Sequence, residues 1–464
     1  MNSAKADLNS GSVAEQMARV SAPMLVGLIS VIAIGLSDAF FLARAGEAEL
    51  AAVGFVYPII VAVSAFSVGL AAGANTALSQ ARGAQKDDDV VRRLALHAAL
   101  LGLAFGLTFA LLFWLAAPLL FSLLGAEGAV LDNILAYLPF WIASFPILVV
   151  TMILDSAFRA AGDGLTVACV MVLTAVLNIT FTPILIFGTG PAPEMGMAGA
   201  GLGTLAARAI AFSLIVFLSI RRRMISIGFT SAHGLRGSVR QIVGTALPAA
   251  LSRAINPAGM AIVTAAVAVL GDTAVAGFGA AARVQAIAVV PFAALAAGVG
   301  PVVGQAWGAG NKLRAREAMR TAAVFSLCYG VVLGLTLFTF ARPLAQFMTA
   351  GGSSTDYAAS YLRFVGCSIG TYGFVLVANA AMIGRSQAKW AMGLSLARIG
   401  IIYIPLAWLG MFTLGYPGIL AAAILANLCG TWGALIAARA TGIGPVDFTI
   451  VRQSANRLKT TWNR

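Results

Sequence analysis

The 464-residue sequence is poor in charge and in the residue types that carry most enzyme chemistry. Only 10% of its residues are charged, against about 25% in an average soluble protein, so they could not cover a soluble surface. Its two histidines and four cysteines show no metal-ligand or C-x-x-C spacing, and no Ser/His/Asp arrangement is present. We therefore expect no metal, no cofactor and no catalytic residues, and hence no enzyme. Soluble, secreted and nucleic-acid-binding classes are excluded as well.

Long apolar runs dominate instead. Sixty per cent of residues are hydrophobic, and the mean hydropathy is +0.92. A bilayer core of about 30 Å needs about 20 apolar residues per helix, and the runs are too long and too uniform for barrel strands. The sequence predicts an all-α polytopic membrane protein with twelve spans. They are 19–44, 52–80, 93–118, 133–160, 165–189, 197–220, 240–270, 274–304, 318–340, 357–384, 390–413 and 417–438.

The net charge of +13 is explained by membrane sidedness rather than by nucleic acid. Alternate connections and the two termini carry 23 of the 30 lysines and arginines, whereas the other side has only Arg44 and Arg342. Cytoplasmic loops of membrane proteins collect Lys and Arg. We therefore expect a multi-pass protein of the plasma (inner) membrane with both termini in the cytoplasm.

The two halves of the chain resemble each other. GLAAGANTALSQARGAQ, at the end of the second span, is matched by ALAAGVGPVVGQAWGAG at the end of the eighth, so that Gly73 and Gln80 correspond to Gly298 and Gln305. Because each half has an even number of spans, the halves insert in the same orientation, and a pseudo-twofold axis along the membrane normal relates them. The predicted organisation is an N-terminal tail 1–18, an N-lobe 19–220, a linker 221–239, a C-lobe 240–438 and a C-terminal tail 439–464.

Ionisable residues inside spans are costly and are functional candidates by default. Asp38 lies in the first span, six residues before Arg44, with no opposite charge one helical turn away. We interpret it as a proton or cation site, and the alternative is a carboxyl that pairs structurally with a neighbouring helix. Pro23, in the same span, is placed to bend this helix. Asp155 lies four residues before Arg159, which favours an intrahelical ion pair over a substrate contact.

Uncharged polar residues add further candidates. Asn178 and Thr182 are four residues apart in the fifth span, so they share one helix face. They are candidates for substrate or ion binding in the N-lobe, although hydrogen bonding between helices would explain them equally well. Asn256 and Asn379 are weaker candidates for a polar site in the C-lobe.

These residues resemble the multidrug and toxic compound extrusion (MATE) family, and within it the DinF-like branch. The resemblance covers about residues 15–440. It implies two six-helix lobes and efflux of organic cations or amphipathic compounds, driven by inward H⁺ or Na⁺ through alternating access. The matching motifs are Asp38-x-Phe40-Phe41 with Pro23 upstream, Ala51-Ala52-Val53-Gly54, Gln80-x-x-Gly83-Ala84, Arg159-Ala160-x-Gly162-Asp163, Asn178 with Pro183, and Gln305-x-x-Gly308-Ala309.

The resemblance also implies an N-lobe site made by a first-helix Asp, a fifth-helix Asn and Asp, and a sixth-helix Thr. Asp38, Asn178 and Thr204 match these places, whereas Thr182 stands where the fifth-helix Asp would be. Asn256 stands where some members carry a seventh-helix Glu. Since Na⁺ binding would need several hard oxygen ligands, the single remaining carboxylate favours H⁺ as the coupling ion, at Asp38.

The alternative function is a lipid-linked oligosaccharide flippase of the same wider superfamily. It would need a cationic central cavity for the diphosphate, and Arg208, Arg253, Arg283 and Arg363 lie within spans. A channel is disfavoured by the two-lobe repeat and by the lack of a ring of pore-lining charges. In either transporter we expect a monomer whose partners are a small molecule, H⁺ and the lipid bilayer.

Overall fold

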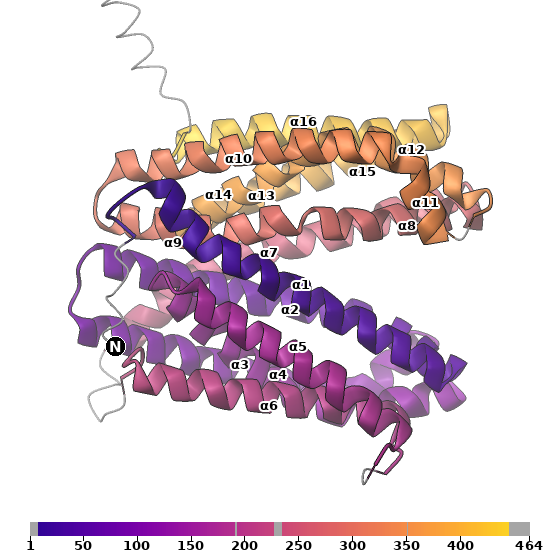
Figure 1. Cartoon of the computed structure of the whole chain (residues 1–464), viewed down its shortest axis with the longest axis horizontal. Coiled ribbons are helices and arrows are strands. Elements are labelled where there is room, and N and C mark those ends of the chain that lie inside the picture. The colour runs from indigo at the N-terminus through magenta and orange to yellow at the C-terminus, as the bar shows by residue number, and fades with distance from the viewer. Residues whose placement is uncertain (1–7, 191–192, 227–233, 350, 445–464) are drawn as a thin grey trace, which may run out of the picture.

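The computed structural model describes residues 8–190, 193–226, 234–349 and 351–444. Every regular element in these ranges is a helix, and twelve spans within them are long and apolar enough to cross a membrane. The predicted class, an all-α polytopic protein with twelve spans, is therefore confirmed. The helices form two lobes, with α1 to α6 in one and α7 to α16 in the other (Figure 1).

The N-lobe is built from six continuous helices, one for each predicted span. Proline does not break them: Pro23 lies inside the first and Pro58 inside the second. Local caps set some of the ends, because the Asp163 carboxylate accepts from the Thr166 amide at 3.0 Å where the fifth helix begins. The helices are α1 (Val13–Ala45), α2 (Glu47–Gly83), α3 (Asp88–Leu123), α4 (Gly128–Ala160), α5 (Gly164–Phe187) and α6 (Gly196–Arg221).

In the C-lobe, three of the predicted single spans are interrupted. The eighth breaks at Val289, where Pro291 removes a backbone donor in the next turn. The tenth passes through a 3₁₀ turn, and the eleventh through a π-helical segment, Ala397–Tyr403, ahead of Pro405. The helices are α7 (Leu235–Ala268), α8 (Asp272–Ala288), α9 (Val290–Gly308), α10 (Lys312–Thr339), α11 (Ala341–Thr349), α12 (Ser354–Phe364), α13 (Ile369–Gly384), α14 (Ala388–Leu396), α15 (Ile404–Leu414) and α16 (Tyr416–Ala440).

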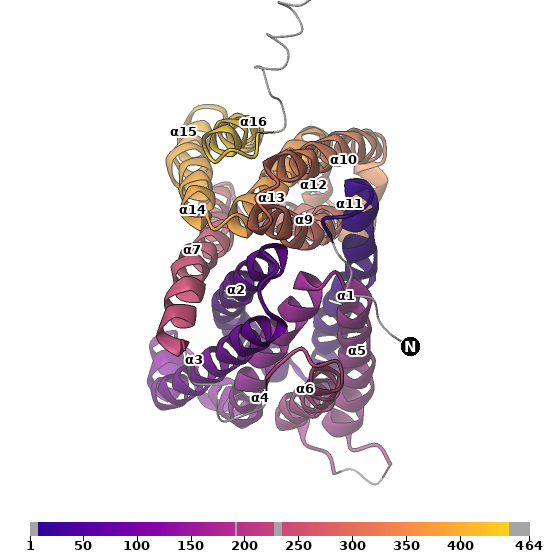
Figure 2. The same ribbon diagram turned by 90° about the vertical axis from the view of Figure 1, so that its left-hand side faces the viewer.

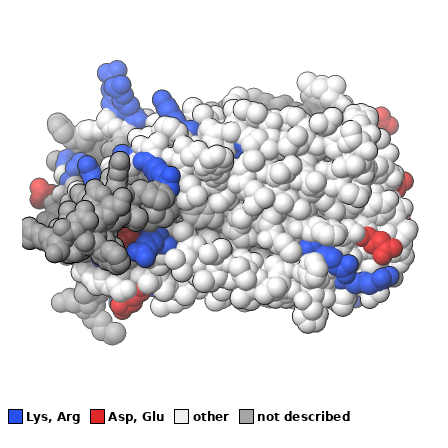
Figure 3. Space-filling model, turned by 90° about the horizontal axis from the view of Figure 1, so that it is seen from above, with Lys and Arg blue, Asp and Glu red and all other residues white. Residues whose placement is uncertain are grey.

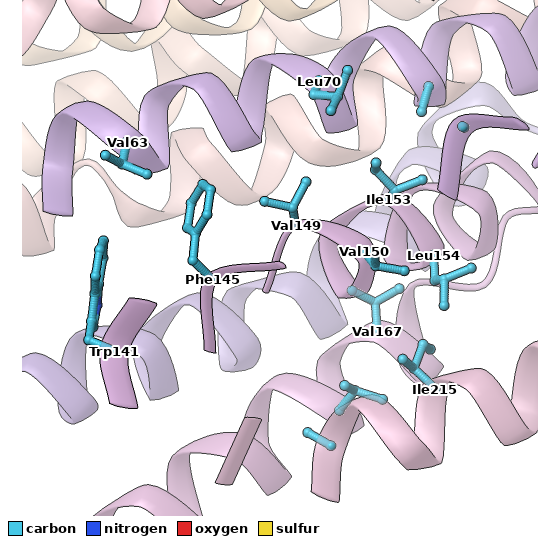
Figure 4. Close-up of a cluster of buried hydrophobic side chains, with 14 of the residues drawn as sticks. Val63, Leu70, Trp141, Phe145, Val149, Val150, Ile153, Leu154, Val167 and Ile215 are labelled. Carbon is cyan, nitrogen blue, oxygen red and sulfur yellow. The ribbon is translucent and has the colours of Figure 1, made fainter. Parts of the chain in front are cut away.

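The core of the N-lobe is centred on α4. Figure 4 shows Trp141, Phe145 and Val149 on one side of this helix, near Val63 and Leu70 of α2. The rings of Trp141 and Phe145 stack with their centroids 6.1 Å apart. Aromatic pairs of this kind add about 0.5–1.5 kcal/mol beyond the area they bury. This packing fixes the rotation of α4, and with it the direction of the polar residues on its other faces.

Positive charge is concentrated at one end of the molecule, which we call the basic end. Lys and Arg side chains gather there on the face drawn in Figure 3, whereas the other end is mixed in charge. The basic end includes the connections from α2 to α3 and from α9 to α10. In Figure 1 the ribbons of the two lobes lie close together at this end and diverge toward the opposite end.

The lobes meet along α2, which packs against α7, α9 and α13 (Figure 2). Glycines allow the closest approaches, since a Cβ on Gly73 would lie 2.6 Å from the carbonyl oxygen of Ile242 in the other lobe. The start of the chain also reaches the C-lobe. There Arg314 donates to the carbonyl oxygens of Leu8, Ser10 and Gly11, at 2.9–3.0 Å.

Candidate functional site

Asp38 lies in the half of the N-lobe away from the basic end, seven residues before the end of α1. At 1.5 Å per residue this places it about 10 Å from the helix end. Its half-buried carboxyl faces Thr182 of α5 and Arg208 of α6. One carboxyl oxygen is buried and has no hydrogen-bond partner among the described residues. An acidic oxygen left free inside a helical lobe is available to a proton, a cation or a ligand.

The other predicted N-lobe residues lie beside it. Asn178, Thr182 and Thr204 are all buried, and the Asn178 amide donates to the Thr204 hydroxyl at 3.2 Å. The amide oxygen of Asn178 is buried without a partner in the described structure, and the buried hydroxyl of Thr182 faces the carboxyl of Asp38. Gly203 lets α5 and α6 approach, since a Cβ there would lie 3.0 Å from Thr182. The structure thus brings the four predicted residues into one polar cluster.

A cation also belongs to this cluster, and the sequence did not place it there. Arg208 faces Asp38 and Tyr137, and it donates to the Ser144 hydroxyl at 2.6 Å. The sequence shows no opposite charge near Asp38 because Arg208 comes from a different helix. Its spacing from Thr204, four residues on one face of α6, is the signal that could have found it. The four predicted residues together with Arg208 form what we call the N-lobe cluster: Asp38, Asn178, Thr182, Thr204 and Arg208.

In the C-lobe the two predicted asparagines lie on one polar strip. Asn256 accepts a hydrogen bond from Arg398, and the Asn379 amide donates to the Ser395 hydroxyl at 3.2 Å. Ser395 and Arg398 are one turn apart in the chain, and Ser395 also bonds Ser252 at 2.8 Å. Arg398, the charged member of this strip, was not among the predicted site residues.

Repeat-related positions make similar contacts in the two lobes but carry different charges. Ser144 and Arg208 of the N-lobe correspond to Ser368 and Asn427 of the C-lobe, which are joined at 2.9 Å. The place of Asp38 is taken by Val263 in the second half of the chain. The C-lobe therefore has no carboxyl at the position that distinguishes the N-lobe.

The prediction that Asp155 and Arg159 form an ion pair is wrong, because the two side chains do not contact each other. Arg159 donates to the Ser156 hydroxyl at 2.8 Å, and one carboxyl oxygen of Asp155 is buried without a partner in the described residues. The two charges still attract each other, but the neutral hydroxyl one turn away gives the guanidinium a closer acceptor.

At the basic end, two repeat-related glutamines cross between the lobes. Gln80 of α2 donates to the carbonyl oxygen of Gly384 at 2.9 Å. Gln305 of α9 donates to that of Ala160 at 2.8 Å. Each glutamine thus binds the end of the fourth predicted span of the opposite lobe. Among the described residues, the hydrogen bonds that join the lobes are gathered at this end, so the structure is closed there.

The same family model matches both halves of the chain. The model, described as MatE, aligns with residues 23–184 and again with residues 248–409. The starting points of the two matches have the same spacing as Gln80 and Gln305. The family model therefore agrees with the repeat seen in the sequence and in the crossed glutamines.

Curated proteins of similar sequence have names that refer to transport or to multidrug resistance. A protein named FAD transporter from Shewanella oneidensis is 31% identical over 91% of this chain and 93% of its own. The probable multidrug resistance protein NorM of Thermotoga maritima is 22% identical over 86% and 89%. Among solved structures, the Vibrio cholerae MATE transporter VcmN in its bent form is 27% identical with a TM-score of 0.88, covering 93% of this chain and 97% of that one.

Proposed function

Because the chain belongs to the MatE family, whose members are membrane transporters, we propose that it exports small amphipathic molecules in exchange for H⁺. The two lobes would expose a central site to each side of the membrane in turn. Since one chain contains both lobes, a monomer suffices. The observation that carries the proposal is Asp38, an acidic residue inside a span with an unpartnered carboxyl oxygen.

The N-lobe cluster offers a way to couple protonation to movement. The Asp38 carboxylate of α1 attracts Arg208 of α6, and a proton on the carboxyl removes that attraction. The position of α1 relative to α6 then depends on the protonation state. Pro23 lies inside α1, where a missing backbone hydrogen bond permits bending.

Protons rather than sodium ions are the proposed coupling ion. Within the described residues, no group of three or more His, Cys, Asp or Glu side chains could hold a metal ion. Thr182 and Asn178 are neutral, so Asp38 is the one carboxylate of the N-lobe cluster. A Na⁺ site would need several oxygen ligands, preferably with more negative charge.

We predict that a pH gradient alone drives substrate transport in liposomes that contain the purified protein. A Na⁺ gradient alone should give no more than the rate in protein-free liposomes. Fluorescent substrate uptake is measured under each gradient, with the other ion balanced across the membrane. Transport that needs Na⁺ and ignores the pH gradient would refute H⁺ coupling.

The basic end is proposed to face the cytoplasm of an inner-membrane protein, in line with the positive-inside tendency. We expect a fluorescent protein fused after Arg464 to be bright and alkaline phosphatase at the same place to be inactive. Fusions ending at Gly125, at the opposite end after three spans, should give the reverse pattern. An external reporter after Arg464 would contradict the twelve-span orientation.

Two substrate classes remain in competition. Organic cations follow from the family resemblance and from relatives named as multidrug proteins. A flavin nucleotide follows from the relative named FAD transporter, which is more similar in sequence. Both classes are small and aromatic or amphipathic, but their charges are opposite. The distribution of charge inside the lobes therefore bears on the choice.

The flippase alternative gains little support from its four arginines. Arg208 is attracted by the carboxylate of Asp38, which offsets part of its charge. Arg283 is exposed, and Arg363 is exposed against Phe338 with 5.8 Å from guanidinium to ring. Only Arg253 remains as a candidate for the wall of a central cavity. Drug resistance conferred on a pump-deficient host would separate an exporter of small molecules from a flippase.

A further inference from the structure

We propose that the C-lobe binds the anionic group of an aromatic substrate at a site formed by Arg398, Tyr372 and Arg253. The inference rests on the proposed export of small amphipathic molecules and specifies their charge. It is carried by two guanidinium groups of the C-lobe that lack a carboxylate partner in the described structure.

Arg398 is the deep element of this site. Its side chain is buried, with 6% of the residue exposed. Its bonds go to neutral groups: to Asn427 at 3.2 Å and to Asn256, while its guanidinium lies 4.8 Å from the centre of the Tyr372 ring. Its Nε is buried without a hydrogen-bond partner among the described residues. A buried charge without a counter-charge is costly, and an anionic ligand would supply the missing charge.

Arg253 is the accessible element. It lies within electrostatic reach of Tyr372 of its own lobe and of Arg159 of the N-lobe, so we place it on the side of the C-lobe that is turned toward the N-lobe. The residue is nevertheless exposed. From this position and exposure we infer that the Arg253 side chain borders the space between the lobes. Tyr372 contacts the Arg398 guanidinium through its ring and lies within electrostatic reach of Arg253, so we place it between the two arginines.

The acidic residues of the C-lobe do not offset these charges. In its described part the carboxyls belong to Asp272, Glu317 and Asp356, near the beginnings of α8, α10 and α12. Asp356 pairs with Arg342 at 3.8 Å. In the N-lobe, by contrast, Asp38 faces Arg208. The interior of the C-lobe thus has a positive charge that repels an organic cation and attracts an anion.

A phosphate group attached to an aromatic ring system fits this arrangement. Guanidinium groups bind phosphate through paired N–H donors, and the phosphate could meet Arg253 first and Arg398 at greater depth. Aromatic ligands stack on guanidinium and tyrosine faces. A carboxylate on an aromatic system shares this chemistry to a weaker degree.

The test compares two flavins that differ by one phosphate. Flavin mononucleotide (FMN) and riboflavin are titrated into the purified full-length protein in detergent, and binding is followed by quenching of flavin fluorescence. The wild type should bind FMN at least tenfold more tightly than riboflavin. Arg253→Gln and Arg398→Gln should each remove most of this preference and weaken riboflavin binding far less than FMN binding.

Matched variants separate charge from folding. Arg363→Gln removes an exposed arginine of the same lobe and should keep the full preference for FMN. Arg398→Lys retains the charge and should keep part of it. If Arg398→Gln does not fold, Arg253→Gln decides the matter, because an exposed side chain contributes little to stability. Inorganic phosphate should compete with FMN in the wild type and not in Arg253→Gln.

Equal affinity of the wild type for FMN and riboflavin would overturn the inference, as would a preference that survives Arg253→Gln. The proposed function fails independently of these results, because binding at equilibrium needs no ion gradient. A protein that exports ethidium under a pH gradient and shows no preference for FMN would keep its proposed function and lose this site.

Discussion

Replacing Asp38 with asparagine is expected to abolish gradient-driven export while the protein still folds and reaches the membrane. Asparagine has nearly the size and shape of aspartate, but it cannot exchange a proton. The neighbouring Thr182 and Arg208 would keep a polar partner. Export is measured in liposomes under a pH gradient, and we expect it to fall to the rate of protein-free liposomes.

The reason lies in the energy that a proton can supply. A ligand shifts an equilibrium only if it binds one arrangement better than the other, and a proton on Asp38 is such a ligand. A tenfold difference in proton affinity between outward- and inward-facing arrangements is worth about 1.4 kcal/mol. A hundredfold difference, about 3 kcal/mol, would bias the lobes strongly. The asparagine variant removes this contribution of the proton to the conformational free energy completely.

The control must be an aspartate that the mechanism does not use. Asp155→Asn is unsuitable as a control. A mild effect on export would be expected only if Asp155 paired with Arg159, and that ion pair is absent. Asp132 is exposed near the start of α4, and Asp132→Asn should transport like the wild type. If the Asp38→Asn variant exports substrate as fast as the wild type under a pH gradient, Asp38 has a purely structural role.

The sequence was sufficient for the fold because its strongest signals are physical requirements of the bilayer. Twelve apolar runs of span length, and the repetition of a six-span unit, each follow from composition and spacing. The interrupted helices of the C-lobe could not be predicted in the same way. Pro291 accompanies a break and Pro58 does not, because neighbouring helices decide whether the backbone groups freed by proline find partners.

The site was predicted only in part, for a related reason. Asp38 is visible in the sequence because a charge in an apolar run is rare. Arg208 and Arg398 also lie in apolar runs, but their partners lie on other helices, and helix rotation cannot be read from spacing alone. The reverse error occurred at Asp155 and Arg159, where the i, i+4 spacing suggested a pair and Ser156 gave the guanidinium a nearer acceptor.

Adding one methyl group at Gly83 or Gly308 is expected to force the lobes apart at the basic end. A Cβ on Gly83 would collide with the carbonyl oxygen of Gln305, and a Cβ on Gly308 with that of Gln80. Both obstacles are backbone, so no side chain can turn aside. Overpacking of this kind costs about 1–3 kcal/mol, which shifts the closed arrangement about five- to 150-fold toward the open one.

The shift can be measured by the accessibility of a cysteine behind the closed contact. Ser79 is buried there, and Ser79→Cys is introduced into a variant whose four native cysteines are replaced. In vesicles with the basic end outward, a membrane-impermeant maleimide should label this cysteine slowly. Gly83→Ala and Gly308→Ala should each speed labelling by about tenfold or more, and both should slow export because the closed arrangement is part of the cycle.

Two glycines of the same helices provide the controls. Gly54 of α2 has no atom within 4 Å of an added Cβ, and at Gly300 of α9 the nearest is the Ala380 carbonyl oxygen at 3.8 Å. At both positions alanine can replace glycine without a collision. The substitution should therefore leave the stability of the protein unchanged or raise it by up to about 1 kcal/mol. Faster labelling confined to Gly83→Ala and Gly308→Ala would therefore locate the cause at the crossing of the two glutamines. Labelling unchanged in all four variants would mean that this contact does not close the basic end.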